Sequence, residues 1–115
     1  MKIRPQQMEA MAAYSRRQFE NQMIRQVREE FPEETREADD EDVRAFVREQ
    51  IDKAASYGIT TKEDVEVYID RAAFYGDAWD TSLDWAHEIL SRPDVDGADK
   101  IQEIRRYEAV ELGEE

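Results

Sequence analysis

Apolar residues recur along most of the chain with the spacing of an α-helix rather than that of a strand. In the first segment they lie four or seven residues apart and form one stripe, which comprises Met8, Ala12, Phe19, Met23, Val27 and Phe31. Pro5 suits the first turn of a helix, and Pro32 bars its continuation. The pattern therefore predicts a long N-terminal helix from about Pro5 to Phe31.

The next segment, PEETREADDED (residues 32–42), is predicted to turn the chain and has room for one short helical turn. A second helix is expected to begin beside Asp39 or Asp40, because either carboxylate can accept hydrogen bonds from the free N–H groups at a helix start. Gly58 supplies the left-handed residue that commonly ends a helix. The buried face between these signals is predicted to hold Val43, Phe46, Val47, Ile51, Ala54 and Ala55.

Capping residues and turn residues mark three further helices. Thr60 with Glu63, or Thr61 with Asp64, resembles a capping box at the start of a third helix, which Gly76 ends. A fourth helix is predicted from Thr81 or Ser82 to about Ser91, and a fifth after a cap at Asp96. The inward residues are predicted to be Val65, Tyr68, Ile69 and Ala72, then Leu83, Ala86, Ile89 and Leu90, and finally Ile101 and Ile104.

No stretch alternates apolar and polar residues between turn signals, as a half-buried strand would. The chain of 115 residues suits one domain. The sequence therefore predicts an all-α fold, a compact bundle of about five helices with a long N-terminal helix, in a single domain over residues 1–115. The tail from about residue 112 is expected to fray.

The net charge indicates which classes of partner the protein could bind. The net charge of −13 argues against a nucleic-acid partner, because affinity for phosphates comes from cationic side chains. It is compatible with a basic protein partner or with solubility alone. Residues 1–31 carry six basic and four acidic side chains, so the remaining residues hold a net −15. The basic first segment either packs against the acidic remainder or meets a different partner.

Several classes of protein are excluded or disfavoured by composition. The absence of cysteine excludes disulfides, thiolate zinc sites and cysteine nucleophiles. No apolar run approaches the roughly 18 residues that a membrane span needs. Gln, Glu and Arg interrupt the N-terminus, so it has no apolar signal core, and we expect a cytoplasmic protein without a membrane partner.

The segment FYGDAWDTSLDW (residues 74–85) concentrates both tryptophans and three aspartates. A calcium loop that began at Asp77 would place Trp79 at a ligand position and Ser82 at the required glycine. The segment DVDGADKIQEIR (residues 94–105) fails the same test, because its glycine comes two places early. His87 is the only histidine, and Ser91 stands where a zinc motif needs a second one. We expect no metal site.

Acid–base catalysis needs a carboxyl group whose pKa burial has raised, and Asp80 or Asp84 beside the tryptophans is the one placement that suggests this. Capping is the simpler role for Asp80, and a favourable contact with the helix dipole is the simpler role for Asp84. No set of nucleophile, base and orienting group can be named. We therefore expect no catalytic residue, no cofactor and no enzymatic activity.

Two roles remain for the aromatic segment. Tryptophan most often closes a small core, with a large apolar body and one N–H at the rim. The alternative is an exposed hot spot for a partner. A division is also consistent with the pattern, with Trp85 inside and Tyr75 or Trp79 at the surface. The candidate partner-binding residues are Tyr75, Asp77, Trp79, Asp80 and Trp85.

Three segments in order carry a family resemblance: RRQFENQMIRQVREEFP (16–32), YGITTKEDVEVYID (57–70) and FYGDAWDTSLDWAHEILSRPDVDGADKIQEI (74–104). Over residues 16–105 the chain resembles small helical accessory proteins encoded beside spike, PAAR and toxin genes of bacterial type VI secretion systems. The chain departs from that pattern at Trp79, where phenylalanine is more usual. The resemblance implies a helper rather than an enzyme and carries over no catalytic residues.

The sequence thus predicts a non-enzymatic protein-binding accessory, an adaptor or chaperone for a type VI secretion effector or spike component. Its partner would be that effector, spike or toxin polypeptide. Two alternatives stay open: an immunity protein that neutralises a toxin, and an acidic mimic of nucleic acid that blocks a DNA-binding protein. The long methionine-bearing stripe of the first helix also leaves a homodimer open.

Overall fold

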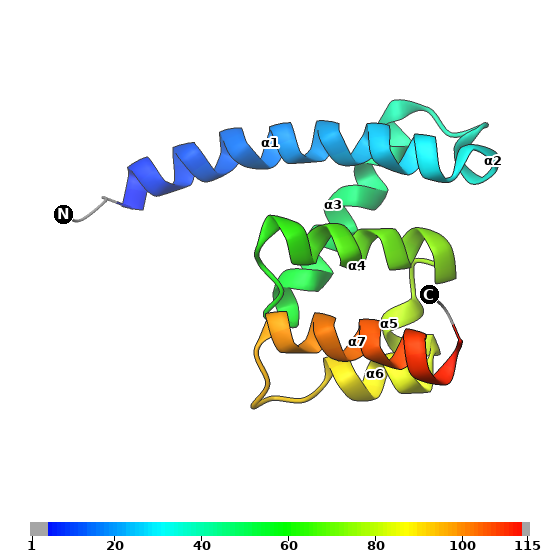
Figure 1. Ribbon diagram of the computed structural model, residues 1–115. Helices are drawn as coiled ribbons and strands as arrows, with labels where there is room; N and C mark the ends of the chain where they lie inside the picture. The colour runs from blue at the N-terminus through cyan, green and yellow to red at the C-terminus, as the bar shows by residue number, and fades with distance from the viewer. Residues whose placement is uncertain (1–4, 114–115) are drawn as a thin grey trace. The chain divides into compact units, whose positions relative to one another are not determined.

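The computed structural model describes the backbone of residues 5–113 and the side chains of residues 15–113. Within this part of the chain every regular element is helical and no residue lies in a strand, so the all-α prediction is confirmed. Seven helices are present there (Figure 1): α1 (Pro5–Glu30), α2 (Pro32–Thr35), α3 (Asp40–Ser56), α4 (Lys62–Tyr75), α5 (Trp79–Ser82), α6 (Asp84–Leu90) and α7 (Gly97–Glu111).

Two single-turn helices account for the difference from the five helices predicted. One is α2, which is the short helical turn that the sequence allowed in residues 32–42. The other is α5, which ends because Leu83 is extended, with φ −99° and ψ 114°. The fourth predicted helix therefore begins at Asp84 and not at Thr81 or Ser82, and neither of those hydroxyls caps it.

The capping signals locate the other helix starts. Asp39 accepts a hydrogen bond from the Asp42 amide at 2.9 Å at the start of α3. Thr61, rather than Thr60, caps α4, and Asp96 caps α7 through the Asp99 amide at 2.9 Å. Gly58 and Gly76 end α3 and α4 with φ of +82° and +117°, which side chains with a Cβ rarely adopt.

The chain divides into two compact units, and the boundary between Val47 and Arg48 falls inside α3. In the first unit the Arg28 guanidinium bonds the carbonyls of Thr35 and Ala38 at 3.0 and 2.8 Å, which ties α1 to the turn after α2. Of the predicted apolar stripe, Phe19, Met23 and Val27 are buried and Phe31 is half-buried. The side chains of Met8 and Ala12 lie outside the described residues. The single-domain prediction stays a prediction.

The second unit contains α4 to α7 and the end of α3. Gly97 at the start of α7 approaches Gly58, which lies four residues before the start of α4, and Tyr75 at the end of α4 bonds Glu108 near the end of α7, so these helices run in the same direction (Figure 1). The core of this unit comprises Ala54, Ile59, Val65, Tyr68, Ile69, Ala72, Trp79, Ala86, Ile89, Leu90, Ile101 and Ile104.

Most inward residues were placed correctly from the helical period. The exceptions are Ala55, which is exposed, and Phe46, Ile51 and Leu83, which are half-buried. Helix α7 ends at Glu111, and of the tail predicted to fray, residues 114–115 lie outside the described part. Among the described helices, none has both the length and the apolar character that crossing a bilayer requires.

Candidate functional site

The five residues predicted to bind a partner occupy three different environments in the second unit. Trp79 and Asp80 are buried, with exposed fractions of 0% and 2%. Tyr75 and Trp85 are half-buried, and Asp77 is exposed. Trp79 closes the core, so the version of the division that places Trp85 inside and Trp79 at the surface is wrong. Tyr75 and Trp85 are both half-buried, so neither lies fully inside or fully at the surface.

Trp79 is the largest fully buried side chain, and it packs among other rings. Its ring centroid lies 5.1 Å from that of Tyr68 and 6.0 Å from that of Tyr75, where the two rings are stacked. The Trp79 indole N–H and the Tyr68 hydroxyl have no hydrogen-bond partner among the residues described. Trp79 thus stabilises the unit through buried apolar area rather than through a hydrogen bond.

Asp80 belongs to a buried polar group and does not cap a helix. Its Oδ2 accepts a hydrogen bond from the Tyr57 hydroxyl at 2.7 Å. Its Oδ1 lies 3.1 Å from the Lys53 ammonium, which also donates to the Asp77 carbonyl at 2.7 Å. A buried carboxylate with these two partners is stable, whereas the loss of either partner would leave a costly charge.

This arrangement sets the pKa values of the group. Burial alone would raise the pKa of the Asp80 carboxyl, but the Tyr57 hydrogen bond and the Lys53 ammonium hold that pKa below its usual range. Burial, followed by the bond to Asp80, raises the pKa of Tyr57 to about 12. Asp80 therefore stays ionised at neutral pH and cannot act as the general acid that its position beside Trp79 suggested.

Tyr75 is tied to a second buried carboxylate. Glu108 of α7 accepts hydrogen bonds from the Tyr75 hydroxyl and from Arg71 Nε, each at 2.7 Å. This contact joins the end of α4 to α7 and fixes the Tyr75 ring. The ring then lies edge-on to Trp85, with centroids 5.8 Å apart, so Tyr75 supports Trp85 from within the unit.

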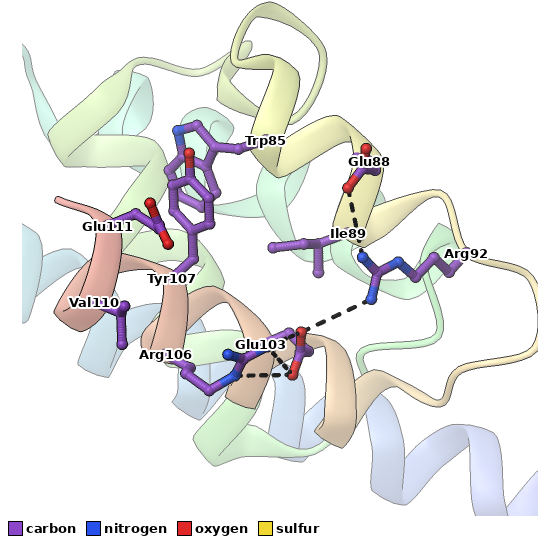
Figure 2. A pocket seen from close by; sticks show the side chains of 9 residues that line it. All are labelled: Trp85, Glu88, Ile89, Arg92, Glu103, Arg106, Tyr107, Val110 and Glu111. Carbon is purple, nitrogen blue, oxygen red and sulfur yellow. Dashed lines mark hydrogen bonds and ion pairs between the residues drawn. The ribbon is translucent and has the colours of Figure 1, made fainter.

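Trp85 lies at an open pocket between α6 and α7. Its ring is stacked on Tyr107 of α7, with centroids 4.5 Å apart and planes 7° apart. Figure 2 shows this stacked pair on one side of the pocket, with Ile89 between it and the charged residues around Arg92. The volume is about 180 Å³, and the remaining lining residues are Glu88, Arg92, Glu103, Arg106, Val110 and Glu111. Val110 is 66% exposed, the most exposed of the large apolar side chains described.

Most of the charges in this pocket are paired with one another. Arg106 binds Glu103 at 2.8 Å, which lowers the pKa of the Glu103 carboxyl. Arg92 lies 3.6 Å from Glu88 and 3.8 Å from Glu103. Glu111 has no ion pair or hydrogen bond among the described residues, although its charge helps to raise the pKa of Arg106 after the larger effect of Glu103. The pocket thus holds three carboxylates and two guanidinium groups, both of which are already engaged.

No family model, curated protein or solved structure matches this chain. The resemblance to type VI secretion accessory proteins therefore stays a prediction. In the part of the chain that the structure describes, no three histidine, aspartate or glutamate side chains come together as a group that could hold a metal ion.

Of the pocket residues, the sequence predictions included only Trp85 as a site residue. Glu88 and Arg92 on the α6 side were missed, and so were all the residues that α7 contributes, because only the buried stripe of Ile101 and Ile104 was assigned on that helix. A second stripe follows beside it at spacings of four and three: Glu103, Tyr107 and Val110. An aromatic and an aliphatic residue at helical spacing, next to a buried stripe, indicate a partly covered face and could have identified this wall.

Proposed function

We propose that this protein is a non-enzymatic protein-binding accessory, an adaptor or chaperone for an effector or spike component of a type VI secretion system. The observation that supports the binding role is the α6–α7 pocket. A stacked tryptophan and tyrosine line it and remain partly accessible, and the exposed Val110 lies at its edge. Tryptophan and tyrosine supply much of the energy of protein interfaces.

Size favours a protein partner over a small molecule. Pockets for drug-sized ligands usually enclose about 300–1,000 Å³. The α6–α7 pocket has about 180 Å³ and is open, so it suits one side chain of a larger partner. The secretion context rests on the family resemblance of residues 16–105 alone.

The test is an affinity pull-down of the tagged protein from its native host, with mass spectrometry of the captured polypeptides. Two variants accompany the natural chain. Val110→Glu places a charge on the exposed apolar edge, and Ala109→Glu places the same charge on the neighbouring exposed position of α7, outside the pocket lining. Surface changes of this kind usually alter stability by about 0.5 kcal/mol or less, so both variants should fold.

We expect the natural chain and Ala109→Glu to capture a spike, PAAR-tipped or toxin polypeptide, and Val110→Glu to capture much less. Capture of the chain alone, or of DNA-binding proteins, would remove the secretion proposal in favour of self-association or nucleic-acid mimicry. Stoichiometric inhibition of a captured toxin would identify an immunity protein instead of a chaperone.

A further inference from the structure

The charges around the α6–α7 pocket favour a cationic group over an anionic one. Residues 48–115 contain eight basic and 18 acidic side chains, so this unit carries −10 of the total −13. Both pocket arginines are bound to carboxylates of the pocket itself, and Glu111 adds a further negative charge. An anionic group would have to displace Glu103 from Arg106 and would meet a repulsive field, whereas a cationic group meets an attractive one.

The walls of the pocket select among cations. Ile89 and Val110 offer aliphatic surface to a side-chain stem, and the Trp85–Tyr107 pair offers aromatic surface. A guanidinium is planar, stacks on aromatic faces and binds carboxylates through two parallel N–H groups, which a lysine ammonium cannot do. The pocket already contains one example of such a pair, because Nε and Nη2 of Arg106 donate to the two carboxylate oxygens of Glu103 at 3.2 and 2.8 Å.

We propose that the α6–α7 pocket binds an arginine side chain that a basic segment of the partner protein presents. The stem of the arginine lies against Ile89 and Val110, its guanidinium stacks beside the Trp85–Tyr107 pair, and its charge pairs with Glu111. This inference rests on the proposed function as a protein-binding accessory and states which chemistry of the partner the pocket recognises.

The probe is an acetylated and amidated alanine-based peptide of about 15 residues, the length at which such a helix becomes marginally stable in water. It carries one leucine and, four residues later, one arginine. The reference peptide has citrulline in place of arginine, which keeps the shape and removes the charge. Binding is followed by the two indole N–H signals in nuclear magnetic resonance spectra, because Trp85 lines the pocket and Trp79 is fully buried.

We expect the arginine peptide to shift the Trp85 signal and to leave the Trp79 signal in place. Glu111→Gln should weaken binding of this peptide about threefold, the size of one exposed ion pair, and should not change binding of the citrulline peptide. Glu63→Gln is the matched control, because it removes one exposed carboxylate at the start of α4, away from the pocket lining. It should bind both peptides as the natural chain does.

Three results would overturn the proposal: an unshifted Trp85 signal, equal affinity for the arginine and citrulline peptides, or equal weakening by Glu111→Gln and Glu63→Gln. The last would mean that diffuse charge, not the pocket, attracts the peptide. The dispersion of the amide signals of each variant verifies that it is folded. The peptide titration is independent of the pull-down, so a captured partner together with a failed titration would remove the arginine proposal and leave the accessory function intact.

Discussion

Gly97 allows the first turn of α7 to approach the end of α3, and its substitution by alanine gives a prediction whose sign depends on that approach. A Cβ built on Gly97 would lie 2.7 Å from the carbonyl carbon of Gly58 and 2.8 Å from Cα of Ile59, and still closer to the Gly58 oxygen. All three neighbours are backbone atoms, which cannot rotate away as a side chain can.

Two opposing effects determine how much Gly97→Ala changes the free energy of unfolding. Alanine is favoured over glycine inside a helix by about 0.5–1 kcal/mol. Forcing an extra carbon into a packed contact costs about 1–3 kcal/mol, because the backbone must shift. The shift would also strain the bond from Lys100 Nζ to the Tyr57 carbonyl, 3.0 Å long, one turn further along α7. We therefore expect Gly97→Ala to lower the free energy of unfolding by about 1–2 kcal/mol.

The assay is urea unfolding followed by circular dichroism and tryptophan fluorescence. Ala98→Gly is the matched control, because Ala98 is exposed at the next position and its substitution changes only helix propensity, by about 0.5–1 kcal/mol. The reasoning would be refuted if Gly97→Ala were as stable as the natural chain, or more stable, while Ala98→Gly was destabilised. That pair of results would mean that propensity acts at both positions and that no close approach opposes it at Gly97.

Three further predictions concern the buried aromatic and polar groups. Trp79→Ala should lower the free energy of unfolding by about 3–5 kcal/mol. Trp79→Phe should lower it by far less, because phenylalanine keeps most of the buried ring and also removes the unpartnered indole N–H. Equal urea midpoints for the two variants would contradict a core role for Trp79. The pKa of the Asp80 carboxyl is lowered in the folded chain, so the ionised carboxylate stabilises the fold at every pH above its unfolded pKa of about 4. This stabilisation is lost as the pH falls through the folded pKa. Asp80→Asn should therefore flatten the acid limb of a plot of melting temperature against pH. The pKa of the Tyr57 hydroxyl is raised from 10.0 to about 12, so the protonated hydroxyl contributes its full stabilisation of the fold below pH 10 and loses it as the pH rises through about 12. Tyr57→Phe should remove a step near pH 12 from the ultraviolet titration of tyrosinate.

Local signals in the sequence were sufficient to place most helices. Thr61, Asp96 and Gly58 act through atoms of their own or neighbouring residues, so their roles depend little on the tertiary fold. The helical period placed Tyr68 and Ile69 inward for the same reason. The break at Leu83 was not predicted, because apolar spacing continues through it and no glycine or proline marks it.

The aromatic segment shows where local signals fail. Trp79 and Asp80 are adjacent, and adjacent helical residues point about 100° apart, so both are buried only where neighbours surround the turn on two sides. Those neighbours come from Lys53 and Tyr57, more than 20 residues earlier in the chain. Nothing in the spacing of residues 74–85 could reveal this arrangement. The wall of the pocket likewise needs α6 and α7 together, since Trp85 and Tyr107 are far apart in sequence.

Negative charge consequently has two separate uses in the second unit. Asp80 was expected to attract a partner, but its carboxylate is buried and is paired with the Lys53 ammonium and the Tyr57 hydroxyl. Glu111 carries the same formal charge at the pocket, exposed and without an ion pair among the described residues. Asp80→Asn and Glu111→Gln each remove one negative charge, so a protein that attracted its partner by net charge alone would respond equally to both. We expect the first to alter stability and the second to alter binding of the arginine peptide, because location rather than total charge decides what each carboxylate does.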